Sequence, residues 1–179
     1  MDRILDLFLS ILGLLTLSPF ILFLFIVCWL DTGSPFFIQS RVGQNQKLFK
    51  LYKFRTMEIG TASLPTHLVD QSKITKLGYF LRCYKLDELP QLWNVLKGEM
   101  SVVGPRPCLL SQTVLIRERE RLEVFTAKPG MTGVAQIKNV DMSSPKALAR
   151  LDAQMLNEAK ITLYLKIIFI TILHIFRKR

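Results

Sequence analysis

The sequence predicts a mainly helical α+β protein that is bound to a membrane through its N-terminal segment. Residues 7–30 carry no charged side chain, and short apolar runs broken by glycine and proline follow them. Near the C-terminus, apolar residues recur in steps of three and four, which indicates an amphipathic helix. The 179 residues leave room for one compact domain besides the membrane segment, because domains usually take roughly 100–200 residues. We therefore expect a membrane segment at 1–31 and a single domain at 32–179.

Composition restricts the classes of protein and of chemistry. Half of the residues are hydrophobic and the formal net charge is +10, a combination typical of proteins that lie against anionic lipid. The chain has no zinc-finger spacing and no Lys/Arg run interleaved with aromatic residues, so we expect no nucleic-acid partner. Three cysteines without Cys-x-x-Cys spacing favour a reducing compartment. Two histidines are too few for a histidine metal site or a Ser-His-Asp triad, so catalysis would depend on carboxylates.

The apolar segment at 7–30 is long enough to cross a bilayer. As a helix it would extend about 36 Å, against a hydrocarbon core of roughly 30 Å. However, Ser18 and Pro19 fall at its midpoint, and a proline in a helix interior removes a hydrogen bond and costs about 3 kcal/mol. A sharp bend is therefore expected there. Two arrangements remain open: a kinked helix that crosses the membrane, and a hairpin that enters and leaves on one face.

Charges on either side of this segment indicate its orientation. Asp2 and Asp6 stand where a signal peptide would carry basic residues, so we expect the segment to stay attached. These carboxylates offset Arg3 and leave the side of the N-terminus open. Five cations after the segment place that end on the cytoplasmic side: Arg41, Lys47, Lys50, Lys53 and Arg55. In the hairpin arrangement both ends would lie there.

Local patterns predict short elements in the first part of the domain. Residues 35–38 and 49–54 are short apolar runs near Gly and Pro, which are typical of short strands and loops. Residues 60–71 are expected to form a mobile surface loop.

Helical spacing over 72–100 predicts two helices. The second should start near Asp87, with Pro90 in its first turn, and should end at Gly98. Residues 101–107 are expected to be a short strand that runs into a rigid turn, because a residue before a proline is biased away from helix.

The last part of the chain is predicted to contain a charged helix at 117–125, a turn at 128–133 and a C-terminal amphipathic helix. Lys166 and the basic residues 177–179 favour a C-terminal helix that lies in the membrane interface. The alternative is an ordinary helix buried against the domain. In either case, the apolar stripe of the C-terminal helix comprises Ile161, Leu165, Ile168, Ile172 and Ile175.

The adjacent carboxylates of Asp87 and Glu88 are the main candidates for chemistry. They lie close in sequence to Arg82, Lys85 and Lys97. A purely structural interpretation is available, in which Asp87 is the N-cap of a helix and Glu88 is a first-turn acid that the helix dipole favours.

Fixed cations around this pair instead suggest a phosphate site. Lys53, Arg55, Arg82 and Arg106 lie on short, constrained segments, and Arg106 stands between two prolines. A guanidinium can bond two phosphate oxygens at once, and a helix N-terminus near Asp87 adds backbone donors. Each cation taken alone could equally be a solvated surface charge.

Three stretches resemble the bacterial sugar transferase family, the monotopic phosphoglycosyl transferases. Residues 85–107 read KLDELPQLWNVLKGEMSVVGPRP, residues 53–57 read KFRTM, and residues 129–136 read PGMTGVAQ. The resemblance also includes the apolar segment with its Ser18-Pro19 break, so it covers nearly the whole chain and looks like the minimal, single-domain type. It implies a re-entrant helix-break-helix at the N-terminus and a cytosol-facing catalytic domain on the bacterial inner membrane.

The resemblance also implies a reaction. Family members transfer a sugar 1-phosphate from a nucleoside diphosphate sugar, here expected to be a UDP-sugar, to polyprenyl (undecaprenyl) phosphate. Asp87 and Glu88 correspond to the carboxylate pair of the family, called the dyad below. Asp87 would attack the β-phosphorus and form a covalent phosphosugar intermediate with release of UMP. Glu88, with Asp87 and the diphosphate, would hold Mg²⁺, which prefers oxygen ligands. Such attack by a carboxylate requires that its repulsion from phosphate be neutralised.

The phosphate-binding residues are expected to be Lys53, Arg55, Arg82 and Arg106. The family commonly continues after Gln136 with a Val-Asn-Gly-Arg-like run, where this chain has Lys138 and no arginine. Lys138 is therefore expected to replace that arginine, with weaker, non-bidentate contacts.

Two other functions remain to be distinguished from transfer: a catalytically silent membrane adaptor and a hydrolase of nucleotide sugars. Expected partners are the UDP-sugar, the polyprenyl phosphate and membrane lipids, with a second copy of the chain or glycosyltransferases of the same pathway as further candidates. The sequence does not identify the sugar or the glycan pathway.

Overall fold

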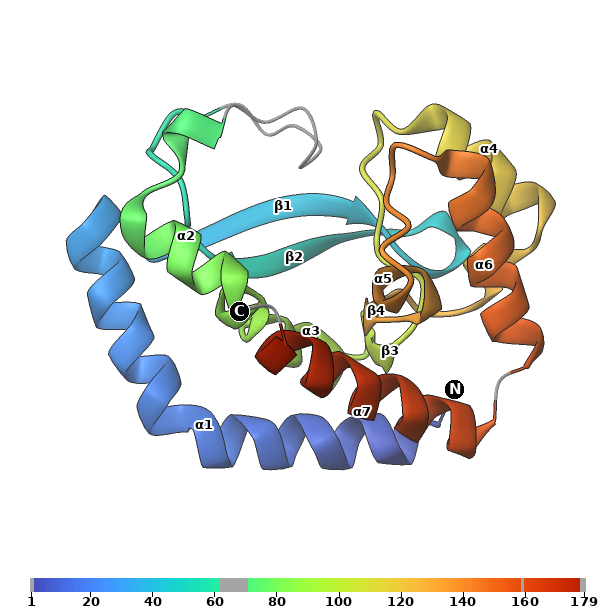
Figure 1. The fold of residues 1–179 in the computed structure, drawn as a ribbon, viewed down its shortest axis with the longest axis horizontal. Helices are drawn as coiled ribbons and strands as arrows, with labels where there is room; N and C mark the ends of the chain where they lie inside the picture. Colours follow the sequence, from blue (N-terminus) through green and yellow to red (C-terminus); the bar gives the residue numbers. More distant parts are fainter. Residues whose placement is uncertain (1, 62–70, 159, 178–179) are drawn as a thin grey trace.

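The computed structural model describes residues 2–61, 71–158 and 160–177 as a mainly helical α+β fold with two small sheets (Figure 1). The fold class expected from the sequence is therefore confirmed. The predicted surface loop at 60–71 lies largely outside the described residues. The helices are α1 (Arg3–Thr32), α2 (Lys76–Cys83), α3 (Gln91–Lys97), α4 (Thr113–Arg121), α5 (Val134–Ile137), α6 (Pro145–Asn157) and α7 (Ile161–Arg177). The strands are β1 (Phe36–Val42), β2 (Leu48–Phe54), β3 (Ser101–Val103) and β4 (Gly130–Thr132).

The N-terminal helix α1 is continuous from Arg3 to Thr32 and bends about midway along its length (Figure 1). The predicted break is thus a bend within one helix. Pro19 is the proline inside α1, and its missing N–H explains why the helix can bend. The carboxylate of Asp2 caps the start, accepting from the Ile4 amide at 3.1 Å, and Gly33 ends the helix with φ +72°. Within the described residues, α1 is the helix whose length and apolar composition would allow it to cross a membrane.

The C-terminal helix α7 runs beside the N-terminal half of α1 and closes the lower face of the domain (Figure 1). Its inner side is buried through Tyr164 and Ile167. The stripe predicted from the sequence lies largely on its outer side, where apolar side chains are exposed: Ile161, Leu165, Phe169, Ile172 and Leu173. Helix α7 is therefore apolar on two sides, one against the domain and one against the surroundings. The buried side agrees with the alternative of a helix packed against the domain, and the position of the exposed side in a membrane interface stays a prediction.

A buried carboxylate joins α1 to the rest of the molecule. Asp6, which is 2% exposed, accepts hydrogen bonds at Oδ1 from Ser101 Oγ (2.9 Å), the Val102 amide (2.8 Å) and Tyr164 Oη (2.6 Å). One side chain of α1 therefore holds β3 and α7 together. The sequence interpretation treated Asp6 only as a flanking charge.

The two sheets each contain two strands. Strands β1 and β2 form an antiparallel hairpin with Phe36 opposite Phe54, which confirms the predicted short strands. Strands β3 and β4 are parallel, so the turn predicted at 128–133 is wrong in its central residues. The backbones at Gly104 and Gly130 approach so closely that a Cβ on Gly130 would lie 2.0 Å from the Gly104 nitrogen. Only glycine permits this pairing.

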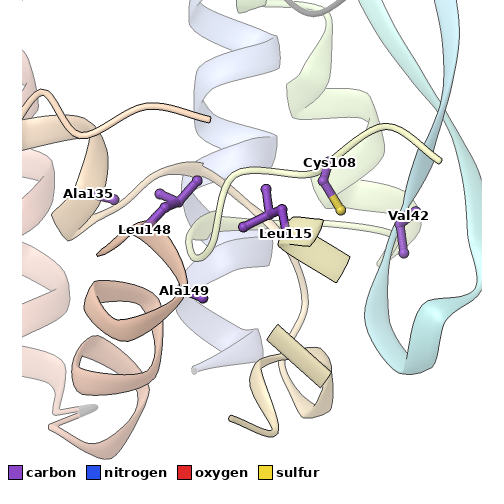
Figure 2. Close-up of a cluster of buried hydrophobic side chains, with 6 residues drawn as sticks. All are labelled: Val42, Cys108, Leu115, Ala135, Leu148 and Ala149. Carbon is purple, nitrogen blue, oxygen red and sulfur yellow. The ribbon is translucent and has the colours of Figure 1, made fainter. Parts of the chain in front are cut away.

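Helices α4, α5 and α6 cover one end of the β1–β2 hairpin (Figure 1). The helix predicted at 117–125 is misplaced, because α4 runs from Thr113 to Arg121 and the chain turns at Glu123, whose φ is +54°. Helices α5 and α6 were not predicted. Figure 2 shows the buried side chains that join these parts, and the labelled residues are Val42, Cys108, Leu115, Ala135, Leu148 and Ala149.

Candidate active site

The Asp87-Glu88 pair lies in a short 3-10 turn (Leu86–Glu88) between α2 and α3. Lys85 enters this turn with a left-handed backbone (φ +59°), and Pro90 starts the following helix. Asp87 and Glu88 are 7% and 8% exposed. Neither caps α3, whose first turn receives no side-chain hydrogen bond. The N-cap interpretation of Asp87 is therefore wrong, and burial of two adjacent carboxylates requires another explanation.

Glu88 is neutralised by two cations. Its Oε1 atom accepts from Lys53 Nζ and from Arg106 Nη2, each at 2.7 Å. Burial alone would raise the pKa of Glu88, but the charges of Arg106 and Lys53 outweigh it and hold that pKa well below its ordinary value. The same ion pair raises the pKa of Arg106. Glu88 is thus ionised at neutral pH.

Asp87 is less strongly bound. Its Oδ2 lies 3.8 Å from Lys53 Nζ, and its buried Oδ1 receives no hydrogen bond from any residue that the structure describes. Burial raises the pKa of Asp87, and the positive charge of Lys53 opposes that effect. A buried carboxylate oxygen without a donor is costly, and it is also available to a ligand. The two neighbouring acids therefore differ: Glu88 is bonded to two cations, and Asp87 has one oxygen that receives no hydrogen bond from the described residues.

An amide on α3 fixes the distance between the dyad and Lys53. Asn94 is fully buried, its Nδ2 donates to the Lys50 carbonyl at 2.7 Å, and its Oδ1 accepts from the Tyr52 amide at 3.1 Å. The side chain bonds to the backbone of β2 on both sides of Leu51. Because Lys53 follows on the same strand, its ammonium is held at a set distance from Glu88.

Arg106 is held in place by its backbone. Pro105 and Pro107 restrict the chain on both sides, and the Arg106 carbonyl accepts from Arg119 Nη1 at 2.8 Å. Arg119 is itself buried and donates through Nε (3.0 Å) and Nη2 (2.7 Å) to the carboxylate of Asp152 on α6. The buried Arg119–Asp152 pair therefore supports the loop that presents Arg106 to the dyad.

The other predicted phosphate-binding residues occupy different positions. Arg82 donates to Thr56 Oγ1 at 2.9 Å. Burial lowers the pKa of Arg82 and the negative charge of Asp87 opposes that effect, so Arg82 lies near Asp87. Arg55 turns toward Ser34 and Phe36, to whose carbonyls it donates at 3.1 and 3.2 Å. Lys138 is exposed at the end of α5, and within the described residues no hydrogen bond or ion pair joins it to the dyad.

The structure adds Arg41 to the cations near the dyad. In the sequence analysis, Arg41 served only to indicate which side of the membrane the end of the apolar segment faces. Arg41 on β1 donates through Nη1 to the Pro107 carbonyl at 3.2 Å, next to Arg106. Burial, followed by the charge of Arg106, lowers the pKa of Arg41 to about 10. No local pattern distinguishes Arg41 from neighbouring basic residues, because the contact spans distant parts of the chain.

Comparison with known proteins decides the family. The sequence profile of the family described as bacterial sugar transferase matches residues 1–178. The chain belongs to this family. The Uncharacterized sugar transferase EpsL of Bacillus subtilis is 42% identical over 175 residues, which cover 96% of this chain and 85% of that protein.

Two longer relatives carry more specific names. The Undecaprenyl-phosphate galactose phosphotransferase of Salmonella typhimurium is 36% identical over 155 residues, covering 76% of this chain and 32% of the relative. The Undecaprenyl-phosphate glucose phosphotransferase of Komagataeibacter xylinus is 38% identical over 186 residues, covering 95% and 35%. This sugar transferase therefore spans about a third of the length of each of them.

The dyad of this sugar transferase has a donor set that suits magnesium. Within the described residues no group of three or more His, Cys, Asp and Glu side chains could hold a metal ion by itself. Mg²⁺, however, is usually bound by one or two carboxylates together with substrate phosphates and water. The uncommitted Oδ1 of Asp87 beside the Glu88 carboxylate meets that requirement.

One pocket of the sugar transferase lies away from the dyad. A pocket of about 310 Å³ lies between β3, the start of α1 and the start of α7, and its lining includes Val103, Met155 and Tyr164 but neither acid of the dyad. Charge and hydrogen bonding, rather than this pocket, make the Asp87-Glu88 pair the candidate active site.

Proposed function

We propose that this protein transfers a sugar 1-phosphate from a UDP-sugar to undecaprenyl phosphate, giving undecaprenyl-diphospho-sugar and UMP. The observation that carries the proposal is the asymmetry of the dyad: Glu88 is bonded to Lys53 and Arg106, whereas the adjacent Asp87 keeps a buried oxygen that no described residue bonds. Membership of the sugar transferase family and the names of the Salmonella and Komagataeibacter relatives support the same reaction.

In the first step, an oxygen of Asp87 attacks the β-phosphorus of the donor. A phosphorus–oxygen bond forms to the carboxylate, and the bond from the β-phosphorus to the bridging oxygen breaks. The bridging oxygen keeps the electron pair and leaves as part of UMP. Lys53, next to both acids, reduces the repulsion between the carboxylate and the phosphates, because fixed charges in a buried site need no reorganisation during the reaction.

In the second step, a phosphate oxygen of the lipid carrier attacks the same phosphorus. The new bond produces the diphosphate link, and the bond to Asp87 breaks, which restores the carboxylate. Splitting a difficult transfer into two displacements is the usual advantage of a covalent intermediate. Glu88 stays ionised throughout, since two cations hold its proton affinity low.

Asp87, Glu88 and the donor diphosphate would together hold Mg²⁺. The ion would supply positive charge where the transition state gathers negative charge on phosphate oxygens. The protein's own contribution is to keep Glu88 charged and correctly placed. Lys53 and Arg106 do this through bonds to one carboxylate oxygen, so the second oxygen is left for the ion.

The membrane arrangement we propose is a re-entrant hairpin, with both ends of α1 on the cytoplasmic face of the inner membrane. The bend of α1 (Figure 1) and the exposed apolar side chains of α1 and α7 support it. In addition, Asp6 bonds the start of α1 to β3 and α7, so the N-terminal end lies against the catalytic domain. A helix that crossed the membrane would hold these ends on opposite sides.

Cysteine labelling tests the arrangement. Asp2→Cys should be introduced together with Cys83→Ser, because Cys28 and Cys108 are buried and Cys83 is the more accessible native thiol. An impermeant maleimide should label residue 2 only after the cells are opened. Labelling in intact cells would contradict the hairpin.

The transfer reaction is tested by UMP release from purified protein in detergent with Mg²⁺, undecaprenyl phosphate and a panel of UDP-sugars that includes galactose and glucose. Asp87→Asn should abolish release while the protein stays folded, and Glu58→Gln, a change in an exposed ion pair, should leave the rate unchanged. UMP release together with free sugar phosphate would indicate a hydrolase. No product from any donor, with no adduct on Asp87, would indicate a silent adaptor.

A further inference from the structure

Arg41 is fixed beside the active-site loop by contacts between distant segments. Its Nη1 donates to the Pro107 carbonyl at 3.2 Å and its Nη2 donates to Gln39 Oε1. The next residue, Val42, donates through its amide to the Cys108 carbonyl at 3.0 Å. The end of β1 is thus joined to the segment that carries Arg106, and the two guanidinium groups are neighbours.

The charge of Arg41 is not neutralised by the protein. In the described part of the chain, no ion pair joins it to a carboxylate, and its buried Nε has no hydrogen-bond partner. Glu88, the acid whose charge reaches it, is already bonded to Lys53 and Arg106. A partly buried cation without a counter-charge is unfavourable unless an anion binds to it.

The cations of the site can be arranged in a row that starts at Asp87, the proposed nucleophile. Arg82 is influenced by the charge of Asp87, Lys53 lies next to both acids, Arg106 bonds to Glu88, and Arg41 bonds to the carbonyl of Pro107, the residue that follows Arg106. In an in-line displacement, the attacking and leaving oxygens lie on opposite sides of the phosphorus. The leaving phosphate should therefore lie at the end of this row of cations that is distant from Asp87.

We propose that Arg41 binds the α-phosphate of the donor, the phosphate that leaves as part of the nucleoside monophosphate. This inference rests on the proposed transfer reaction and assigns a ligand to a residue outside the dyad. The Arg41 guanidinium stabilises the charge that develops on the departing phosphate, and Arg106 and Lys53 remain with Glu88. Its buried Nε has no hydrogen-bond partner among the described residues, so the protein leaves the guanidinium incompletely satisfied.

Binding of UMP to the purified full-length protein tests this assignment without turnover. Titration calorimetry with UMP, in detergent with Mg²⁺, should show an affinity that is about 10- to 100-fold weaker in Arg41→Met, as expected for loss of a charged hydrogen bond. Binding of uridine, which lacks the phosphate, should not change. Arg41→Lys should be intermediate, because lysine keeps the charge and loses the planar fork.

Arg121→Met is the matched control, because Arg121 is an exposed arginine on α4 that pairs with Glu118. It should bind UMP as the wild type does. If Arg41→Met does not fold, as judged by tryptophan fluorescence, the lysine variant carries the test and should still bind UMP several-fold more weakly. In turnover assays the KM for undecaprenyl phosphate should be the same in Arg41→Lys and wild type.

Two results would overturn the assignment while leaving the proposed reaction intact. One is an unchanged UMP affinity in a folded Arg41 variant. The other is a raised KM for undecaprenyl phosphate with unchanged UMP affinity, which would assign Arg41 to the acceptor phosphate. If the wild type binds no nucleoside monophosphate and forms no lipid product, the transfer reaction itself is wrong.

Discussion

The buried Arg119–Asp152 pair offers a test of how the active-site loop is supported. Both side chains are almost fully buried, at 2% and 1% exposure. Asp152→Asn keeps the volume but removes the negative charge, so Arg119 is left as an uncompensated buried cation. Breaking a buried pair in this way typically costs about 3–5 kcal/mol. Because each kcal/mol shifts the melting temperature of a protein of this size by about 2–4 °C, a fall of roughly 6–20 °C is expected.

The assay is thermal unfolding in detergent, followed by circular dichroism. Glu118→Gln serves as the control, since its partner Arg121 has an exposed side chain, and exposed pairs contribute about 0–1 kcal/mol. The double change Arg119→Met with Asp152→Leu should regain much of the stability, because apolar residues can replace a buried pair.

Activity should not recover with stability in that double variant. Methionine cannot donate to the Arg106 carbonyl, which Arg119 holds at 2.8 Å. We therefore expect a stable protein with reduced turnover, which separates support of the loop from support of the fold. A melting temperature of Asp152→Asn within 1 °C of the wild type would refute the reasoning, as would full activity of the double variant.

Three further changes test other parts of the structure. Asp6→Ala removes the acceptor of three hydrogen bonds, two of them buried. It should lower the melting temperature by several degrees or more, because each bond to a charged group contributes about 1.5–3 kcal/mol. An unchanged melting curve would show that α1 is not held there. Because burial raises the pKa of Asp87 and a protonated carboxyl is not a nucleophile, the rate should fall as the pH drops through that raised value. Lys53→Met removes the opposing charge, so this acid limb should move to higher pH in a profile of kcat/KM, and an unmoved limb would contradict the assignment. Gly130→Ala places a methyl group against the Gly104 backbone and should abolish folded expression, measured by size-exclusion chromatography; a well-folded, active variant would show that the two strands can separate.

Local patterns were enough to predict many elements. Proline and glycine mark the bend of α1 at Pro19 and the end of α3 at Gly98, where φ is +83°. The hairpin strands and the short strand at Ser101–Val103 were also expected from local composition. These features depend on backbone geometry that a residue imposes on its own neighbourhood, so the sequence predicts them without knowledge of the fold.

Partners of individual cations were not predictable in the same way. Arg41 and Arg55 are both basic residues near the ends of the hairpin, yet Arg55 bonds to Ser34 and Phe36 and Arg41 reaches Pro107. The family resemblance pointed to Arg55 and did not distinguish Arg41. Which of the two lies near Glu88 depends on how β1 packs against the Arg106 loop.

By itself the sequence determined the class of the fold, the family and the carboxylate pair, because these follow from periodicity and from a contiguous motif. Only the tertiary structure decided that Glu88 is neutralised while an oxygen of Asp87 has no partner in the described part of the chain, that Asp6 joins three elements, and that α7 is apolar on two sides. Burial and hydrogen bonding set these properties, and both arise from contacts between residues that are far apart in the chain.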